Sequence, residues 1–310
     1  MNEATKPPLL EVTDLVIEFG DAPGATHRAL DGATLSVRAG EVLGLVGESG
    51  SGKSTLGLAV GRLLADNARR PGGELKVNGQ PVFELDDAAL RELRRRTLGF
   101  VFQNPMVALD PTMRVGKQVA LASGSKAAVR DLLARVGLRD IERVERSFPH
   151  QLSGGMAQRV VIAMASLDAT LREQIFALLV SLRDSMKTGV VLLSHELRAV
   201  ARHCDTVAVM YAGRVVEYGP ASVVFARPAH PYTQALLAVA PGREKLGEVL
   251  ASIPGAPPAL GGRSEHCAFA DRCGHANAHC RALRPELREV EGRSVACHHA
   301  GELVQFKEAA

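Results

Sequence analysis

A glycine-rich stretch in the first fifth of the chain has the residue types and spacing to bind phosphate. Residues 47–54 read GESGSGKS and fit the pattern G-x-x-x-x-G-K-[ST]. Glycines let a backbone curl so that its N–H groups point at phosphate oxygens, and a following helix adds partial positive charge. We expect Lys53 to reach the β- and γ-phosphates of a nucleotide and the Ser54 hydroxyl to bind Mg²⁺. The predicted binding residues are Gly47, Ser49, Gly50, Ser51, Gly52, Lys53, Ser54 and Thr55.

The segments around this loop alternate between strand-like and helix-like patterns, as in α/β folds. Val42–Val46 (VLGLV) predicts a buried strand before the loop, and Ser54–Leu64 has the apolar spacing of a helix after it. This strand–loop–helix context distinguishes the motif from a chance glycine-rich turn. Other predicted strands are Leu9–Phe19, Ala33–Val37, Leu98–Phe102, Val190–Leu193 and Thr206–Met210, and Ala127–Val136 is predicted to be an amphipathic helix.

A second candidate anion site lies at residues 151–159, which read QLSGGMAQR. Ser153 and the N–H groups of Gly154 and Gly155 would open a helix and point toward a phosphate group. Ser153 before a helix is also good capping chemistry without any ligand. The alternative to an anion site is therefore a plain helix cap.

The composition excludes several classes of protein. The 310 residues carry a net charge of +3, and aromatic residues make up 4% with no Trp, so stacking platforms for single-stranded nucleic acid are not expected. No stretch approaches the roughly 20 apolar residues needed to span a bilayer, and the N-terminus lacks a signal-peptide pattern. We therefore expect a cytosolic chain whose contact with a membrane requires a partner, and we expect no nucleic-acid partner.

The order of the motifs resembles that of the ATP-binding subunits of ABC transporters. Residues 152–156 (LSGGM) look like the family's LSGGQ signature, Phe102-Gln103 like the Q-loop and Ser194-His195-Glu196 like the H-loop. Phe19 is placed like the aromatic residue that stacks on adenine. The resemblance implies ATP and Mg²⁺ as cofactors. It also implies γ-phosphate contacts by Gln103 and His195, and a grip by Ser153, Gly154 and Gly155 on the ATP of the other subunit in a head-to-tail dimer.

Further segments are similar to the oligopeptide and dipeptide importers of this family. They are FQNPM (102–106), PHQLSGGM (149–156), VAVMYAGRVVE (207–217), HPYT (230–233), and IPG with PP within 253–258. The resemblance runs from about Leu9 to His298 and implies uptake of peptides or a related solute. It implies a second ATP-binding subunit, identical or different, two membrane permeases and, indirectly, a periplasmic or extracellular solute-binding protein. It also implies a peripheral location on the cytoplasmic face of the cell (inner) membrane.

The expected fold is an α/β P-loop NTPase core of the ABC ATPase type, with a helical subdomain and a small Cys-containing C-terminal extension. Residues 1–240 would form the ATP-binding domain, with a helical insert at about 104–165. After Pro241 the composition changes to Pro and Gly, and then to a tract rich in Cys and His. Residues 241–310 are therefore expected to form a separate appendage.

Four of the five cysteines lie in this appendage, at spacing C-x5-C-x6-C-x16-C. The spacing is not that of a zinc ribbon, which uses C-x2-C pairs. The extensions of this branch carry four such cysteines, and in some members they ligate a 4Fe–4S cluster. A mixed Cys/His zinc site and free thiols in a loosely folded tail remain as alternatives. The predicted metal ligands are Cys267, Cys273, Cys280 and Cys297, with Ser54 for Mg²⁺.

One expected segment is missing from the sequence. An intact family member follows the signature helix with an apolar strand ending in Asp-Glu, the Walker B motif, which holds Mg²⁺ and polarises the attacking water. Here the predicted helix Arg159–Ala165 runs directly into Ser166–Thr170 (SLDAT), which resembles the next motif, the D-loop. Relative to the family, we therefore expect a gap of roughly fifteen residues, located near positions 165–167 of this chain. The stretch Gly116–Ala128 also looks short for the family's helical subdomain.

The alternative is that Val160–Asp168 is a degenerate Walker B strand, since it is apolar and ends in Asp. Against this, Ala169 stands where Glu is needed, and Gln158-Arg159 places the run on the signature helix. The sequence thus predicts weakened ATP binding and nearly lost hydrolysis. It leaves open an active subunit, a non-hydrolysing partner subunit and a deletion product that does not assemble.

Overall fold

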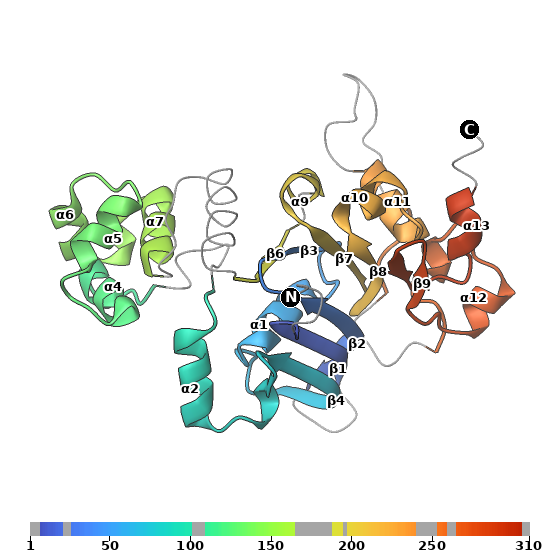
Figure 1. The fold of residues 1–310 in the computed structure, drawn as a ribbon, viewed down its shortest axis with the longest axis horizontal. Helices are drawn as coiled ribbons and strands as arrows, with labels where there is room; N and C mark the ends of the chain where they lie inside the picture. Colours follow the sequence, from blue (N-terminus) through green and yellow to red (C-terminus); the bar gives the residue numbers. More distant parts are fainter. Residues whose placement is uncertain are drawn as a thin grey trace, which may run out of the picture. The chain divides into compact units, whose positions relative to one another are not determined.

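The computed structural model describes residues 7–20, 26–100, 109–164, 188–194, 197–239, 253–258 and 265–305. The chain divides into two compact units (Figure 1). The first unit combines residues 1–86 with 187–310, and the second consists of residues 87–186. In the described residues, no helix is long and apolar enough to cross a membrane.

A six-stranded sheet forms the centre of the first unit, with strand order β6-β3-β7-β8-β10-β9. The strand β3 pairs in parallel with β6 and β7, and the other neighbours are antiparallel. All five side chains of β3 are buried, as expected for a parallel strand with neighbours on both sides. The strands are β3 (Val42–Val46), β6 (Val190–Leu193), β7 (Thr206–Tyr211), β8 (Arg214–Pro220), β9 (Arg288–Val290) and β10 (Arg293–Val295).

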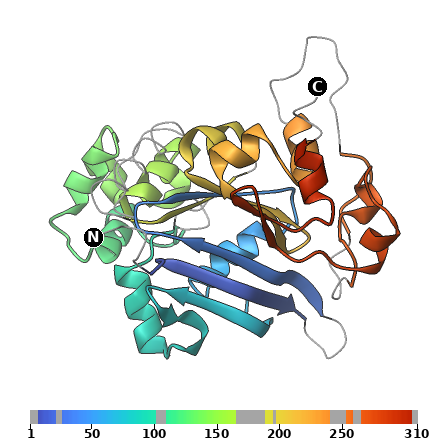
Figure 2. The same ribbon diagram turned by 45° about the vertical axis from the view of Figure 1, so that its right-hand side comes forward.

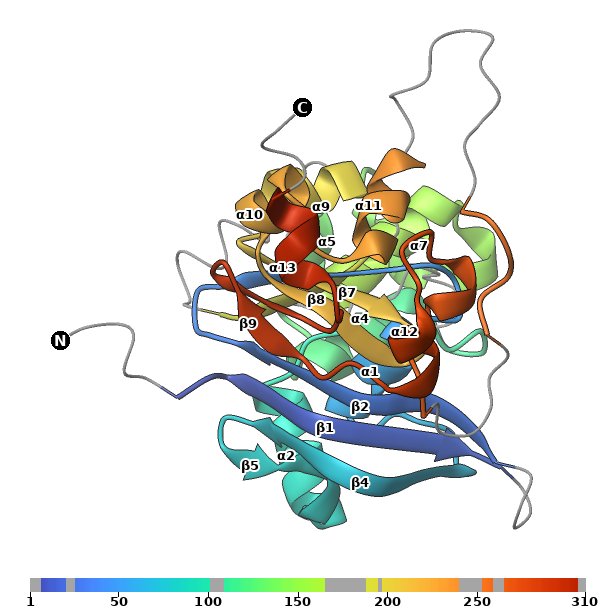
Figure 3. The ribbon, with the colours of Figure 1, turned by 90° about the vertical axis from the view of Figure 1, so that its right-hand side faces the viewer.

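A second, antiparallel sheet of the same unit has the order β2-β1-β4-β5, and its strands lie one below another in the lower part of Figure 3. Alternate residues of its central strand β1 are buried, and the neighbours of β1 pair along its whole length. This alternation is typical of a sheet with one face in the core. The strands are β1 (Leu10–Phe19), β2 (His27–Val37), β4 (Ala68–Val77) and β5 (Gln80–Pro81).

Helices pack on both faces of the six-stranded sheet (Figure 2). Helix α1 packs against β6, because a Cβ added at Gly57 would lie 2.9 Å from the Leu193 side chain. The opposite face is covered by residues of α9, α10 and α11, which share one apolar cluster with β3, β7 and β8. The helices of this unit are α1 (Lys53–Val60), η2 (Val82–Glu84), α9 (Leu197–His203), α10 (Ala221–Ala226), α11 (Pro231–Ala238), η4 (Ala270–Arg272), α12 (Ala278–Ala282) and α13 (Ala300–Gln305).

The Cys-bearing extension is not a separate appendage, contrary to the expectation from composition. Its strand β10 pairs with β8, so the extension continues the central sheet (Figure 3). Phe269 of the extension lies in the apolar cluster of the sheet and is only 3% exposed. The Pro- and Gly-rich composition does not prevent this packing, because strand pairing by β10 and the buried Phe269 join the extension to the sheet.

The second unit consists of helices packed around their own apolar core. The core is built from buried residues of α4, α5, α6 and α7 and includes Val119, Leu133, Val144 and Val160. The helices are α2 (Asp87–Arg96), α4 (Val115–Ser123), α5 (Val129–Arg135), α6 (Ile141–Arg146), η3 (Pro149–Gln151) and α7 (Gly154–Met164). The predicted amphipathic helix at Ala127–Val136 is thereby confirmed as α5.

One predicted strand differs from the structure. Of the expected strand Leu98–Phe102, residues 98–100 belong to no strand, and residues 101 and 102 lie outside the described residues. A strand needs a neighbour to complete its backbone hydrogen bonds, and neither described sheet provides one for Leu98, Gly99 or Phe100. Apolar composition alone was an insufficient signal at this length.

Candidate functional site

The glycine-rich loop leaves the carboxyl end of β3 and turns directly into α1. Two glycines make this turn possible. Gly47 has φ +150°, and a Cβ there would lie 2.2 Å from the Met210 carbonyl oxygen. Gly52 has φ +102°, precedes the first residue of α1, and a Cβ there would lie 2.8 Å from the Ala29 carbonyl oxygen. The sequence pattern therefore has a steric basis, because a side chain at either position would push the loop away from its neighbours.

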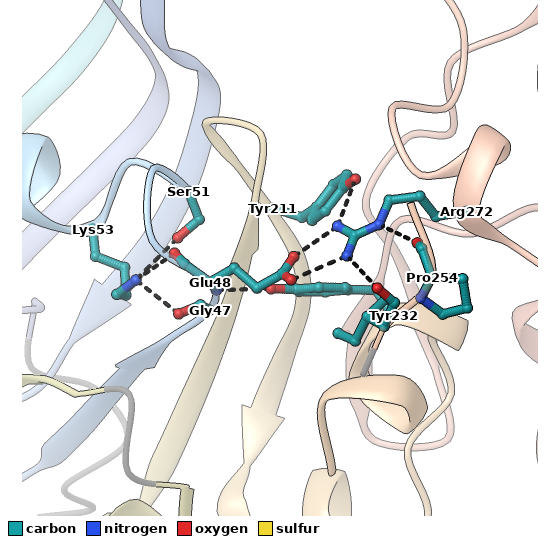
Figure 4. Close-up of polar contacts among 9 residues, drawn as sticks. Gly47, Glu48, Ser51, Lys53, Tyr211, Tyr232, Pro254 and Arg272 are labelled. Carbon is teal, nitrogen blue, oxygen red and sulfur yellow. Dashed lines mark hydrogen bonds and ion pairs between the residues drawn. The ribbon is translucent and has the colours of Figure 1, made fainter. Parts of the chain in front are cut away.

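Lys53 folds back over the loop that precedes it (Figure 4). Its Nζ donates hydrogen bonds of 2.8 Å to the carbonyl oxygens of Gly47 and Glu48 and of 3.2 Å to the Ser51 hydroxyl. Burial lowers the pKa of Lys53, and the nearby Glu48 carboxylate partly opposes that shift. The ammonium thus lies at the centre of the loop, where the charge of a bound phosphate would be concentrated.

The remaining predicted loop residues divide by exposure. Ser51 is buried, and its carbonyl oxygen accepts the Gly213 N–H at 3.0 Å. Ser49, Gly50 and Ser54 are exposed, and Thr55 is half-buried. Exposed backbone and hydroxyl groups at the start of a helix are available to phosphate oxygens and to a phosphate-bound cation. The structure thus places the residues predicted to bind phosphate in one continuous turn.

The aromatic residue predicted to stack on adenine lies at the end of β1. Phe19 is half-buried and pairs with His27 on β2 and Ala68 on β4. The adenine contact itself stays a prediction, because the structure fixes only the position of Phe19 at the last residue of its strand.

The Q-loop and H-loop residues, Gln103 and His195, lie outside the described residues. The strand before His195 is nevertheless defined. Leu193 pairs with Leu45, and the Ser194 N–H donates to the Leu45 carbonyl oxygen at 3.1 Å. The carboxyl ends of β3 and β6 therefore meet at the same edge of the sheet.

The signature residues belong to the second unit, where α7 begins at Gly154. The Met156 N–H donates to the Ser153 hydroxyl at 3.3 Å, which makes Ser153 the cap of α7. Ser153, Gly154 and Gly155 are exposed, and a Cβ at either glycine would meet nothing within 4 Å. The plain capping role is thus present, and the first turn of α7 is also open to a ligand.

Three residues that the sequence did not single out as site residues lie on the side of the loop that faces away from Lys53 (Figure 4). The Tyr232 hydroxyl accepts the Glu48 N–H at 2.8 Å. The Arg272 guanidinium contacts both oxygens of the Glu48 carboxylate, at 2.7 and 3.1 Å, and the Tyr211 hydroxyl at 3.3 Å. Both Tyr232 and Arg272 lie in or beside segments that the sequence did single out. Tyr232 belongs to the HPYT segment, and Arg272 directly precedes the candidate ligand Cys273.

The four predicted cysteine ligands line one small cavity of about 10 Å³ together with His298 and His299. Burial raises the pKa of the Cys267, Cys273 and Cys297 thiols, that of Cys297 to about 12. The Cys280 thiol lies 3.5 Å from Nε2 of His299. In the part of the chain that the structure describes, no group of three or more His, Cys, Asp or Glu side chains is arranged to hold a metal ion.

The chemistry available at the loop is therefore binding and positioning of a polyphosphate. Backbone N–H groups, the helix α1 and Lys53 supply positive charge, and exposed Ser54 supplies an oxygen for Mg²⁺. Hydrolysis additionally requires a group that orients and polarises water. None of the loop residues has that role.

Comparisons with known proteins agree with this assignment. The family model described as ABC transporter matches residues 30–170, and the one described as oligopeptide/dipeptide transporter, C-terminal region, matches residues 216–280. A probable peptide ABC transporter ATP-binding protein of Sinorhizobium fredii is 40% identical over 96% of this chain and 97% of its own. The oligopeptide transport ATP-binding protein of Escherichia coli is 39% identical, over 93% of this chain and 92% of its own.

The dipeptide transport ATP-binding protein of Escherichia coli is 40% identical, over 94% of this chain and 96% of its own. Among solved structures, a dimeric ATP-binding cassette in a post-hydrolysis state, bound to ADP and Pi, superimposes with a TM-score of 0.59 at 25% identity. That match covers 68% of this chain and 98% of the cassette. Motifs, sheet order and full-length similarity therefore agree, and the chain belongs to the family of ABC transporter ATP-binding proteins, in its oligopeptide/dipeptide branch.

Proposed function

We propose that this chain is the ATP-binding subunit of an ABC importer for peptides or a related solute, and that it binds Mg-ATP but hydrolyses it poorly. The loop between β3 and α1 supports the first part of the proposal, because its glycines, Lys53 and Ser54 lie together in one turn that leads into α1. The solute class rests on the peptide importers that the chain resembles along its whole length.

The proposed assembly is a head-to-tail pair of ATP-binding subunits, identical or different, on the cytoplasmic face of the membrane. The pair would bind to two membrane permeases. A solute-binding protein would contact the permeases and would be only an indirect partner of this chain. The open first turn of α7 supports the pairing, because Ser153, Gly154 and Gly155 are free to contact the ATP of the other subunit. A dimeric cassette among the similar structures is consistent with it.

Impaired hydrolysis follows from the proposed loss of the Walker B segment. The alignment with the Sinorhizobium fredii relative spans 325 positions, more than the 310 residues of this chain, although it includes only 96% of them. The relative therefore has residues without a counterpart here. The family model match ends at residue 170, directly after the D-loop-like Ser166–Thr170, so this motif still lies within the family region.

The strand β6 provides a structural argument for the same loss. It is the end strand among the described strands of its sheet, although its sequence, VVLL, is entirely apolar. Val190, Val191 and Leu192 are only half-buried, and Leu193 is 39% exposed. An entirely apolar parallel strand is ordinarily buried on both faces. We infer that β6 is adapted to a neighbouring strand that the described residues do not provide.

Phosphate release from purified protein with Mg-ATP tests the proposal. The matched variants are Lys53→Ala, which removes the loop ammonium, and Lys117→Ala, which removes an exposed lysine of the second unit. We expect wild type and Lys117→Ala to bind a fluorescent ATP analogue and Lys53→Ala to bind it far more weakly. None of the three should release phosphate above the background. Wild-type turnover that Lys53→Ala abolishes would show that another carboxylate performs the Walker B role.

A non-hydrolysing subunit would still be useful within a mixed pair, because its signature could complete the ATP site of an intact subunit. Mixing this chain with an intact peptide-importer subunit should then raise the turnover of the intact subunit, and Ser153→Arg should cancel that gain. The remaining alternative, a deletion product that never assembles, predicts aggregated protein. A monodisperse peak in size-exclusion chromatography would exclude it.

We also propose that the four cysteines hold a 4Fe–4S cluster rather than zinc. Their convergence on one cavity supports a shared ligand, whereas a single zinc ion needs three or four closely placed ligands, which the described residues do not provide. The cavity is smaller than a cluster, so cluster binding requires the cysteine segments to move apart. Anaerobically purified protein should absorb near 400 nm and contain iron, and Cys267→Ala should remove both signals. Stoichiometric zinc without that absorbance, or no metal at all, would refute the cluster.

A further inference from the structure

We propose that Arg272 of the C-terminal extension is a positioning residue of the nucleotide site, which neutralises Glu48 and keeps its carboxylate away from Lys53 and from the triphosphate. The inference rests on the proposed binding of ATP at the loop. It assigns to the extension a direct part in that binding, through one ion pair with the loop.

The contact between Arg272 and Glu48 has the geometry of a strong ion pair. Nη1 lies 2.7 Å from one carboxylate oxygen and Nη2 lies 3.1 Å from the other, which is the bidentate arrangement that favours arginine over lysine. The Arg272 side chain is 4% exposed, and Glu48 is 27% exposed. Such a buried pair is screened much less by salt and water than a surface pair.

The guanidinium is held in place by groups other than Glu48, from the extension and from β7. Its Nε donates to the Pro254 carbonyl oxygen at 2.9 Å, and its carbon lies 5.7 and 5.9 Å from the ring centres of Tyr211 and Phe269. These rings also contact each other at 5.2 Å between centroids. The arginine is therefore fixed before it reaches the loop, and its partner Glu48 has to adopt the matching position.

Glu48 is the second residue of the phosphate-binding loop, so its position affects the groups that bind nucleotide. Its carbonyl oxygen accepts a hydrogen bond from Lys53 Nζ at 2.8 Å, and its N–H donates to the Tyr232 hydroxyl at 2.8 Å. Figure 4 shows the carboxylate directed toward Arg272, with Lys53 on the other side of the loop backbone. The pair thus separates the one acidic side chain of the loop from its one ammonium group.

Removal of Arg272 would leave a carboxylate without its partner beside a site for an anion. The free carboxylate would repel the phosphates and would compete with them for Lys53. Charge neutralisation therefore predicts that loss of the arginine weakens ATP binding and that removal of the Glu48 charge compensates for it. A purely structural role for Arg272 predicts no such compensation, because Glu48→Gln does not restore the lost packing.

The test measures the dissociation constant of a fluorescent ATP analogue with Mg²⁺ for the full chain and three variants. We expect Arg272→Ala to bind about tenfold more weakly than wild type, equivalent to about 1.4 kcal/mol. Arg272→Ala/Glu48→Gln should recover most of that loss. Arg281→Ala, which removes an exposed arginine paired with Asp271 in the same extension, should bind like wild type. Thermal melting of each variant establishes that it is folded.

A dissociation constant of Arg272→Ala equal to that of wild type would overturn the inference and leave the proposed function intact. So would a double variant that binds as weakly as Arg272→Ala. If Arg272→Ala does not fold, Arg272→Lys replaces it, because lysine keeps the positive charge but not the bidentate contact. The dissociation constant of Arg272→Lys for the ATP analogue should lie within about threefold of the wild-type value. An affinity as much as about tenfold weaker would contradict charge neutralisation. Folded wild-type protein that binds no ATP would overturn the proposed function and this inference together.

Discussion

A buried ion pair joins the C-terminal extension to the central sheet, and its removal should be among the most destabilising single changes in the chain. Glu217 of β8 and Arg293 of β10 both have fully buried side chains, with 3.8 Å between Oε1 and Nη1. The Glu217 carboxylate also accepts the backbone N–H groups of Ala229 at 2.8 Å and His230 at 3.0 Å. It therefore fixes the start of the segment that carries Tyr232 to the loop.

The expected cost of Glu217→Ala follows from what it leaves behind. Arg293 would remain charged and fully buried with only the more exposed carboxylate of Glu291, 3.6 Å from its Nη2, and two backbone N–H groups would lose their acceptor. Breaking a buried pair from one side costs about 3–5 kcal/mol. At roughly 2–4 °C per kcal/mol for a domain of this size class, the melting temperature should fall by roughly 6–20 °C. Glu217→Leu/Arg293→Met should cost less, because it leaves no unpaired buried charge, although the two backbone N–H groups still lose their acceptor.

Urea unfolding of wild type, the single variant and the double variant measures these free energies directly. Glu286→Ala is the matched control, because Glu286 is an exposed carboxylate of the same extension and its loss should change stability by less than about 0.5 kcal/mol. The reasoning fails if Glu217→Ala costs less than about 1 kcal/mol, or if the double variant is as unstable as the single variant.

Three further outcomes are expected. Burial lowers the pKa of His230 to about 3 from 6.5, so its neutral ring stabilises the fold above pH 6.5, and that contribution falls as the pH decreases toward 3. At pH 5 the loss is about 2 kcal/mol, and His230→Asn should remove this slope from the urea midpoints. Gly52→Ala, with φ +102° and a carbonyl oxygen 2.8 Å from its new Cβ, should cost about 1–3 kcal/mol, whereas Gly99→Ala, in open space, should be close to neutral by thermal melting. Tyr232→Phe removes the acceptor of the Glu48 N–H. It should lower the free energy of unfolding by about 1 kcal/mol in urea and weaken nucleotide binding. An unchanged free energy of unfolding and an unchanged dissociation constant would exclude a supporting role for the hydroxyl.

The parts of the fold that the sequence predicted are those with a strong local signal. Val42–Val46 is apolar without interruption and is followed by a motif that only one geometry satisfies, so strand, loop and helix were all predicted within a few residues. The strand-rich composition of Leu9–Phe19 likewise predicted β1, which begins at Leu10. The Ser153 cap and the helix after it were predicted from a pattern that serves capping and anion binding equally.

The parts that the sequence did not predict depend on long-range pairing. The strand β4 contains Pro71, Gly72 and Gly73, which favour turns, yet it pairs with β1 because that strand needs a second neighbour. The strand β10 is three residues long, too short for any periodicity, and it forms because β8 offers a free edge. The contact between Glu48 and Arg272 joins residues 224 positions apart, a separation at which a single sequence carries no pairing signal.

The two sides of the glycine-rich loop differ in the contacts that the described residues provide. On the side of β7 and β8, the loop is held by Tyr232, Arg272 and a sheet that continues into the extension. On the side of β6, the described sheet ends in half-exposed apolar side chains, at the edge where the missing strand and its two carboxylates are expected. Nucleotide binding depends on the first side and water activation on the second. The proposed loss of the Walker B segment is therefore expected to impair hydrolysis more than nucleotide binding.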